Sequence, residues 1–114
     1  MRTESVTLRH LTAYDKHYTP YYKQYTAHNV VVFHDTATTE KGHQKSRAIL
    51  YFFPRFSQLI TSPQKTVSFA DAEFQPGDRM LLSKDTRDSW MIVKITPFLN
   101  GSNYVEHYRL ECVQ

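Results

Sequence analysis

Short runs of β-branched and aromatic residues, separated by turn signals, constrain this fold more than any other feature. Runs of this kind recur at spacings of about 8–12 residues, which is typical of an all-β barrel or sandwich. The run at residues 28–34 (HNVVVFH) is continuous, as expected for a strand buried on both faces, and the run at 47–53 resembles it. Further strand-like runs lie at residues 5–10, 18–25, 79–83, 89–96 and 103–112.

Turn chemistry separates these runs. In Gln75-Pro76-Gly77-Asp78 the proline presets φ and the glycine is free to take a positive φ, and Asn100-Gly101 is a hairpin dipeptide. We therefore predict a small antiparallel β-barrel or sandwich of about six to seven strands, in one domain spanning residues 1–114. Pro20 predicts an edge strand or a bend in its run. Residues 56–60 and 68–73 are the two candidates for a short helix.

The polar segment at residues 35–46 (DTATTEKGHQKS) separates two runs that are expected to be buried strands. A tight hairpin needs only about two to five residues between its strands. Long polar connections in compact domains are usually functional or disordered. The sequence therefore predicts one long inter-strand loop at residues 35–46, with a role outside the core.

Composition excludes several classes of protein. The net charge of +3 comes from 14 basic and 11 acidic residues, which falls short of the clustered basic stripe of a dedicated duplex binder. The single cysteine, Cys112, can form no internal disulfide, so a reducing origin is expected. The N-terminus has no apolar signal region, and the longest apolar run is six residues, at 48–53. A membrane helix needs about twenty, so we expect a soluble protein with no membrane partner.

The sequence predicts neither catalysis nor a metal or cofactor. The six histidines lack the short, fixed spacings of zinc ligands. There is no G-x-S-x-G elbow, P-loop or G-x-G-x-x-G motif. Cys112 and His107 are five residues apart on one expected strand and should face opposite sides.

A tyrosine-rich stretch with two lysines, Lys16 and Lys23, has two interpretations. Tyrosine is enriched at subunit interfaces. Aromatic faces beside cations can instead stack single-stranded bases, as on an OB-fold. We favour the interface because the cations are few. The predicted interface residues are Tyr18, Tyr21, Tyr22 and Tyr25, with Tyr14 close by in the sequence.

The order of these elements resembles the small head-closure proteins of tailed phages, which are also called stopper, head-completion or minor capsid proteins. The resemblance spans nearly the whole chain and is carried by element order together with short motifs. These motifs are Ser5-Val-Thr-Leu8 before a tyrosine-rich strand, Asn29-Val-Val-Val-Phe33 before the polar segment, Phe74-x-Pro-Gly-Asp78-Arg79, the Asn-Gly-Ser turn, and His107-Tyr-Arg-Leu110.

The resemblance implies a structural virion protein of the phage neck, made in the host cytoplasm. Copies would form a homo-oligomeric ring below the portal or adaptor protein and would meet a tail terminator or tail tube protein. The long loop would close the channel on packaged double-stranded DNA, with Gly42 as its flexible point. The loop residues so implied are Asp35, Thr36, Glu40, Lys41, Gly42, His43, Lys45 and Arg47.

Two alternatives stay open. One is an OB-like module that binds single-stranded nucleic acid on Tyr18, Tyr21, Tyr22 and Tyr25. The other is a different neck protein, such as a tail terminator or tail completion protein. Because Asp35 and Glu40 balance Lys41 and Lys45, the loop is near neutral. Its contact could therefore be DNA or another copy of the chain.

Overall fold

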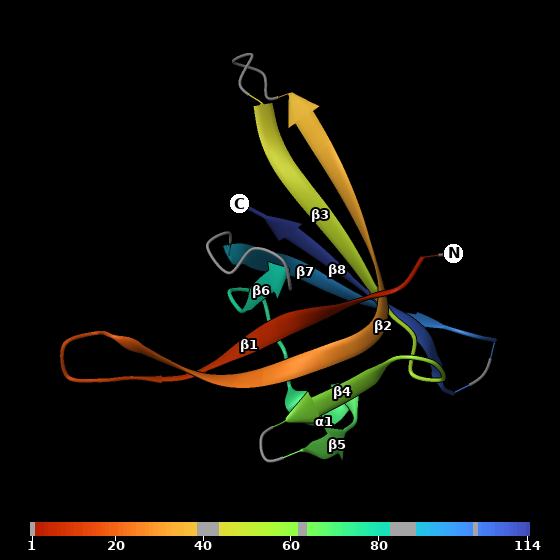
Figure 1. Ribbon diagram of the computed structural model, residues 1–114, viewed down its shortest axis with the longest axis horizontal. Coiled ribbons are helices and arrows are strands. Elements are labelled where there is room, and N and C mark those ends of the chain that lie inside the picture. Colours follow the sequence, from red (N-terminus) through yellow and green to blue (C-terminus); the bar gives the residue numbers. More distant parts are fainter. Residues whose placement is uncertain (1, 39–43, 62–63, 83–88, 102) are drawn as a thin grey trace.

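The computed structural model of the chain describes residues 2–38, 44–61, 64–82, 89–101 and 103–114 (Figure 1). The described residues form eight strands and one short helix in a single connected sheet. In chain order the elements are β1 (Glu4–Tyr14), β2 (Pro20–Thr38), β3 (Gln44–Phe52), β4 (Gln58–Thr61), β5 (Lys65–Val67), α1 (Phe69–Ala72), β6 (Arg79–Leu82), β7 (Ser89–Leu99) and β8 (Val105–Val113).

The sheet turns back on itself. Its strand order is β1-β6-β7-β8-β3-β2-β4-β5, and β1 also pairs with β2. Each of β1, β6, β7, β8, β3 and β2 is thus hydrogen-bonded to the next around a ring, with β4 and β5 added beside β2. All of these pairings are antiparallel. The prediction of a small antiparallel all-β fold is confirmed.

Strand β2 serves two parts of the ring because it bends at Asn29. Residues up to Val30 pair with β1, and residues from Val31 onward pair with β3. Between the pairs Val6↔Ala27 and Glu4↔Val30, β2 carries one more residue than β1, so a β-bulge lies there. Asn29 takes a φ of 58°, a left-handed conformation that asparagine tolerates better than most residues. The runs at 18–25 and 28–34, expected as two strands, are therefore one bent strand that begins at Pro20.

Hydrogen bonds from the β3–β4 turn hold this bend. The Ser57 hydroxyl donates to the carbonyl of Asn29 at 2.7 Å, and the Asn29 side chain donates to the carbonyl of Phe56 at 3.3 Å. The amide of Ser57 donates to the carbonyl of Phe53 at 2.6 Å. Residues 56–60 therefore do not form the predicted helix. They belong to a single turn followed by β4, whose four residues are too few to give a periodic signal.

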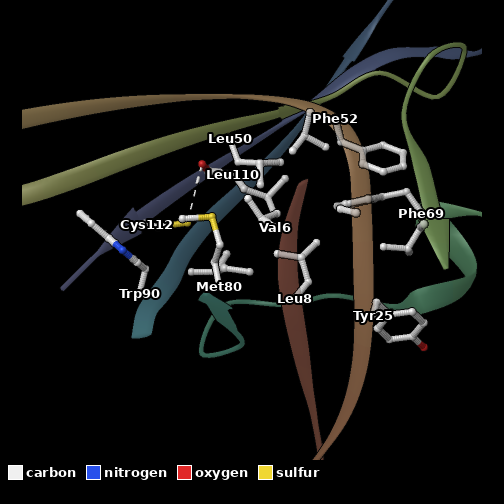
Figure 2. Packing of buried hydrophobic residues seen from close by; sticks show 14 of the residues in the cluster. Val6, Leu8, Tyr25, Leu50, Phe52, Phe69, Met80, Trp90, Leu110 and Cys112 are labelled. Atoms are coloured by element: carbon white, nitrogen blue, oxygen red, sulfur yellow. Dashed lines mark hydrogen bonds between the residues drawn. The ribbon is translucent and has the colours of Figure 1, made fainter. Parts of the chain in front are cut away.

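The core lies inside the ring (Figure 2). Alternate residues of β3 and β8 point inward, including Leu50, Leu110 and Cys112. Helix α1 covers the core with Phe69, whose ring stacks on Tyr108 at 4.1 Å and lies 5.0 Å from the ring of Phe52. The predicted helical segment at 68–73 is confirmed as α1. Its N-cap is Ser68, whose side chain accepts a hydrogen bond from the Asp71 amide.

Candidate functional site

Strands β1 and β2 form a hairpin that projects from the body of the molecule (Figure 1). The β1–β6 pairing ends at Arg9↔Arg79, and the β2–β4 pairing ends at Tyr25↔Thr61. Beyond these pairs, β1 and β2 pair only with each other among the described residues, out to Tyr14↔Pro20. We call residues 10–24 the tyrosine hairpin. A two-stranded ribbon of this kind needs support at its base to hold a fixed direction.

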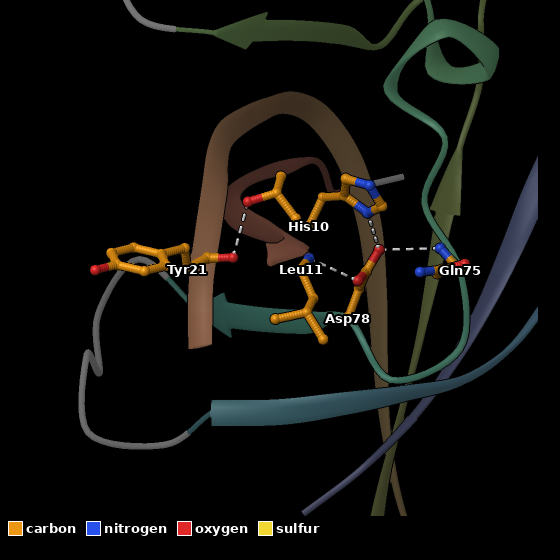
Figure 3. Close-up of polar contacts among 6 residues, drawn as sticks. His10, Leu11, Tyr21, Gln75 and Asp78 are labelled. Carbon is orange, nitrogen blue, oxygen red and sulfur yellow. Dashed lines mark hydrogen bonds and ion pairs between the residues drawn. The ribbon is translucent and has the colours of Figure 1, made fainter. Parts of the chain in front are cut away.

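Asp78 supplies that support (Figure 3). Its carboxylate accepts three hydrogen bonds: from Nδ1 of His10 at 2.8 Å, from the amide of Leu11 at 2.9 Å and from the amide of Gln75 at 2.9 Å. Asp78 is only 1 % exposed. Because Asp78 directly precedes β6, its side chain accepts from Leu11 just where β6 no longer pairs with β1. The sequence identified Asp78 as a turn residue; the structure shows that it also fixes the base of the tyrosine hairpin.

The turn at the end of the tyrosine hairpin is held by Asp15. One carboxylate oxygen of Asp15 accepts from the amides of His17 and Thr19, at 2.7 and 2.8 Å. The backbone of Asp15 also pairs with Tyr18 and Thr19. Tyr18 takes a φ of 61°, a left-handed conformation, and its side chain is exposed. The turn is therefore ordered by local hydrogen bonds and presents Tyr18 to solvent.

Four of the five tyrosines of this stretch are exposed. The exposed fractions are 60 % for Tyr14, 85 % for Tyr18, 57 % for Tyr21 and 36 % for Tyr22, against 3 % for Tyr25. Tyr25 was predicted at a subunit interface, and its burial contradicts that assignment. Tyr21 and Tyr25 are four residues apart on one strand and share a face. Only Tyr25 lies within the body, where its ring contacts Phe74 edge-on at 5.2 Å.

A second projection replaces the predicted loop. Residues 35–38 belong to β2 and residues 44–47 to β3, and they pair in register from Asp35↔Arg47 to Thr38↔Gln44. The prediction of a loop across residues 35–46 is therefore wrong for most of its length. β8 borders β3 only as far as Arg47↔Val113, so the paired strands continue beyond β8. We call residues 36–38 with 44–46 the β2–β3 arm (Figure 1).

Only some of the predicted channel residues lie on the described strands. Asp35, Thr36, Lys45 and Arg47 lie on paired strands, and Arg47 is exposed. Glu40, Lys41, Gly42 and His43 lie outside the described residues. The polar composition suggested a loop because it shows no apolar alternation. Thr36 and Thr38 are β-branched, and this strand propensity was the signal that could have identified the arm.

An aromatic row that the sequence did not indicate crosses the outer face of the sheet. The rings lie 5.8 Å apart for Phe33 and Tyr51, 5.7 Å for Tyr51 and His107, and 4.6 Å for His107 and Phe98, with Phe53 also 5.7 Å from His107. Phe33 and Phe98 are exposed. The row thus joins two exposed rings, Phe33 and Phe98, through the part-buried rings of Tyr51 and His107. The sequence could not reveal it because β2, β3, β8 and β7 become neighbours only in the folded sheet.

A groove of about 450 Å³ lies between α1 with the turn after it and the middle of β7. Its walls include Phe69, Phe74, Pro76, Val93, Pro97 and Tyr108. Val93 lies at a register shift between the pairs Ile92↔Cys112 and Lys94↔Glu111 and is exposed. Glu73 and Lys94 also line the groove. The groove is thus apolar within and charged at its edges.

The described residues bring together no metal-binding cluster. No group of three His, Cys, Asp or Glu side chains among them could hold a metal ion. Burial, with a smaller contribution from Glu111, raises the pKa of the Cys112 thiol to about 12, so the thiol is protonated at neutral pH. Both carboxylate oxygens of Asp78 accept backbone hydrogen bonds, which commits the His10–Asp78 pair to holding the hairpin. No described helix is long and apolar enough to cross a membrane.

Comparison with known proteins adds no relative to this description. Neither a protein-family model, nor a curated protein, nor a solved structure matches the chain. The function must therefore be argued from the two projections, the aromatic row and the groove.

Proposed function

We propose that this chain is a structural, non-enzymatic subunit of the neck of a tailed-phage virion, where copies form a ring around the DNA channel. The observation that carries this proposal is the β2–β3 arm, which continues beyond β8 as strands paired only with each other among the described residues. A small β body with such an arm has the two parts that the head-closure resemblance requires. The body provides contacts between copies, and the arm provides the element that reaches the channel.

A paired arm changes how the channel would be closed. The resemblance implied loops that bend easily, whereas hydrogen-bonded strands keep their direction over several residues. In this proposal each arm reaches the channel as a paired ribbon, and movement takes place where the ribbon leaves the body. The contact with DNA would be to phosphates and independent of sequence. Arg47, exposed where β8 stops pairing with β3, is the described cation best placed for it.

Image reconstruction of the virions that contain this chain tests the proposal directly. We expect a ring of copies between the portal or adaptor and the tail, with one arm from each copy directed toward the axis. Neck density that has no place for the chain would refute the assignment. Portal, capsid and tail genes beside the gene for this chain would independently support it.

Shortening the arm separates a channel role from a role in subunit contacts. In the test variant Asn-Gly replaces residues 37–45, so that the paired residues Thr36 and Ser46 flank a two-residue hairpin turn. The body should stay folded because the core residues that the structure describes all lie outside the removed segment. We expect particles that assemble but retain less DNA. A full-length arm carrying Thr38→Val is the matched control. Failure of assembly would instead indicate a contact between subunits, and unchanged DNA retention would contradict channel closure.

A single-stranded nucleic-acid module is the second candidate, favoured by the exposed tyrosines beside Lys16 and Lys23. Burial of Tyr25 removes one of the four rings on which that function was predicted. Fluorescence anisotropy of a labelled oligonucleotide at moderate salt discriminates the two candidates. Binding that is lost with Tyr18→Ala would favour the nucleic-acid module, and absence of binding at micromolar protein would dismiss it.

A further inference from the structure

The end of the tyrosine hairpin is an exposed aromatic surface that carries one lysine, Lys16. Tyr14, Tyr18 and Tyr21 are more than half exposed. The carboxylate of Asp15 is engaged by two backbone amides within the turn. Lys16, in the turn, is exposed and has no ion-pair partner within the described part of the chain, whereas Lys23 lies across from His10 at the base, with its Nζ 5.5 Å from the centre of the Tyr25 ring. Tyrosine offers a large contact area at low conformational cost, which suits a surface that inserts into a partner.

The groove beside α1 has the complementary character. Rings and prolines form its walls, including Phe69, Pro76 and Tyr108, and its volume of about 450 Å³ is of the size that admits aromatic side chains. Asp71 and Glu73 lie on and just after α1, are exposed, and form no ion pair among the described residues. Lys94, on the opposite wall, lies across from Glu111 in the β7–β8 register. Because the recorded ion pair of Glu111 is with Arg109, at 3.9 Å, the α1 side of the groove is acidic and the β7 side is basic.

A copy's own hairpin cannot fill its own groove. Phe74, in the groove wall, contacts His10 at the base of the hairpin, with ring centroids 6.3 Å apart. Strands advance about 3.3 Å per residue, so the turn lies roughly 13 Å beyond His10. Figure 1 shows the hairpin leading away from α1 and the body. The two surfaces can therefore meet only between different copies.

We propose that the end of the tyrosine hairpin of one copy docks in the α1 groove of the next, with Lys16 set against Asp71 and Glu73. This inference rests on the proposed ring and names its subunit contact. Two different surfaces of one chain make a head-to-tail contact, which generates a ring when the rotation between copies closes. Opposite charges at the rim guide the approach, and the tyrosines supply the buried area.

Cross-linking of the full-length chain tests the docking. In a Cys112→Ala background, one differently tagged copy carries His17→Cys and the other carries Ala70→Cys; both sites are exposed, and Ala70 lines the groove. A short bis-maleimide, which traps transient contacts, should join the two tags at high protein concentration. The matched control replaces Ala70→Cys by Gln58→Cys, which is exposed on β4 and should give little product. Absence of the 17-to-70 product, or equal product from the control, overturns the docking.

Charge exchange adds a readout of specificity. Lys16→Glu should reduce the cross-link roughly tenfold by placing like charges together, and Asp71→Lys with Glu73→Lys on the second copy should restore it. Circular dichroism verifies that each variant is folded. Reduction without restoration refutes the charge pairing. The outcomes separate the two proposals. A chain that is found in the neck but gives no cross-link supports the proposed function and refutes the docking. A chain that gives the cross-link but is absent from the neck supports the docking and refutes the proposed function.

Discussion

Truncation of Asp78 should destabilise the protein strongly, because this one carboxylate satisfies three donors from two parts of the chain. Asp78→Ala leaves the amides of Leu11 and Gln75 without acceptors in a part-buried place. An unpaired buried donor costs about 1–3 kcal/mol, so two amount to roughly 2–6 kcal/mol. This is a large share of the roughly 5–15 kcal/mol by which natural domains are stable.

Urea unfolding followed by fluorescence of Trp90, the single tryptophan and a buried one, measures the loss. With a slope of about 1–3 kcal/mol per molar urea, the midpoint should fall by at least about 0.7 M. Asp78→Asn keeps the volume and one acceptor oxygen and should lose less. Glu106→Ala is the matched control, because Glu106 is exposed and its nearest recorded cation, His107, is 3.7 Å away. Its midpoint should hardly change.

Amide hydrogen exchange shows whether Asp78 supports only the base of the tyrosine hairpin or the whole fold. In Asp78→Ala the Leu11 amide should exchange faster than amides of the ring strands, because the base of the hairpin opens without global unfolding. If Asp78→Ala costs less than about 1 kcal/mol, the three hydrogen bonds do not carry the weight assigned to them. If all amides accelerate equally, Asp78 supports the whole fold and not the direction of the hairpin.

Three further predictions concern burial and backbone conformation. Tyr25→Ala should cost about 3–5 kcal/mol in urea unfolding and Tyr21→Ala under about 0.5 kcal/mol; equal effects would contradict their different burial. Because the thiol of Cys112 has a pKa of about 12 when folded but ionises near pH 9 when unfolded, its contribution to stability is constant below about pH 9 and falls above it, by at most ~1.4 kcal/mol per pH unit. Unfolding of the wild type should therefore weaken more steeply from pH 9 upward than that of Cys112→Ala. Asn29→Val, which forces a β-branched residue to a φ of 58°, should lower the urea midpoint, whereas Asn29→Gly should lose only what the side-chain bond to Phe56 contributes.

The sequence predicted the parts of the fold that repeat locally. Residues 28–34 and 47–53 read as strands because their residue types prefer extended backbone and burial. The sequence did not predict that a bend at Asn29 makes one strand of two expected ones. This bend depends on a hydrogen bond from Ser57, twenty-eight residues away. The arm was mistaken for a loop because two strands that pair beyond the body need no apolar alternation.

The candidate sites could be predicted only in part, because each depends on where the body ends. Tyr21 and Tyr25 occupy equivalent positions in the alternating pattern of one strand. Tyr21 is exposed and Tyr25 is buried because β6 and β4 end between them. The hydrogen bond from the Leu11 amide to Asp78 joins residues 67 positions apart, and no local pattern encodes it. The groove likewise brings α1 together with the middle of β7.

The turn that contains Asp78 links the two proposed halves of the subunit contact. Gln75 and Pro76 line the groove, and Asp78, at the end of the same turn, fixes the base of the tyrosine hairpin. The angle between hairpin and groove is therefore set within one short segment. In a head-to-tail ring this angle determines the rotation from one copy to the next, and hence how many copies close the ring. A carboxylate that is fully engaged and nearly inaccessible to solvent keeps that angle constant, so weakening it should broaden the distribution of ring sizes before it prevents docking.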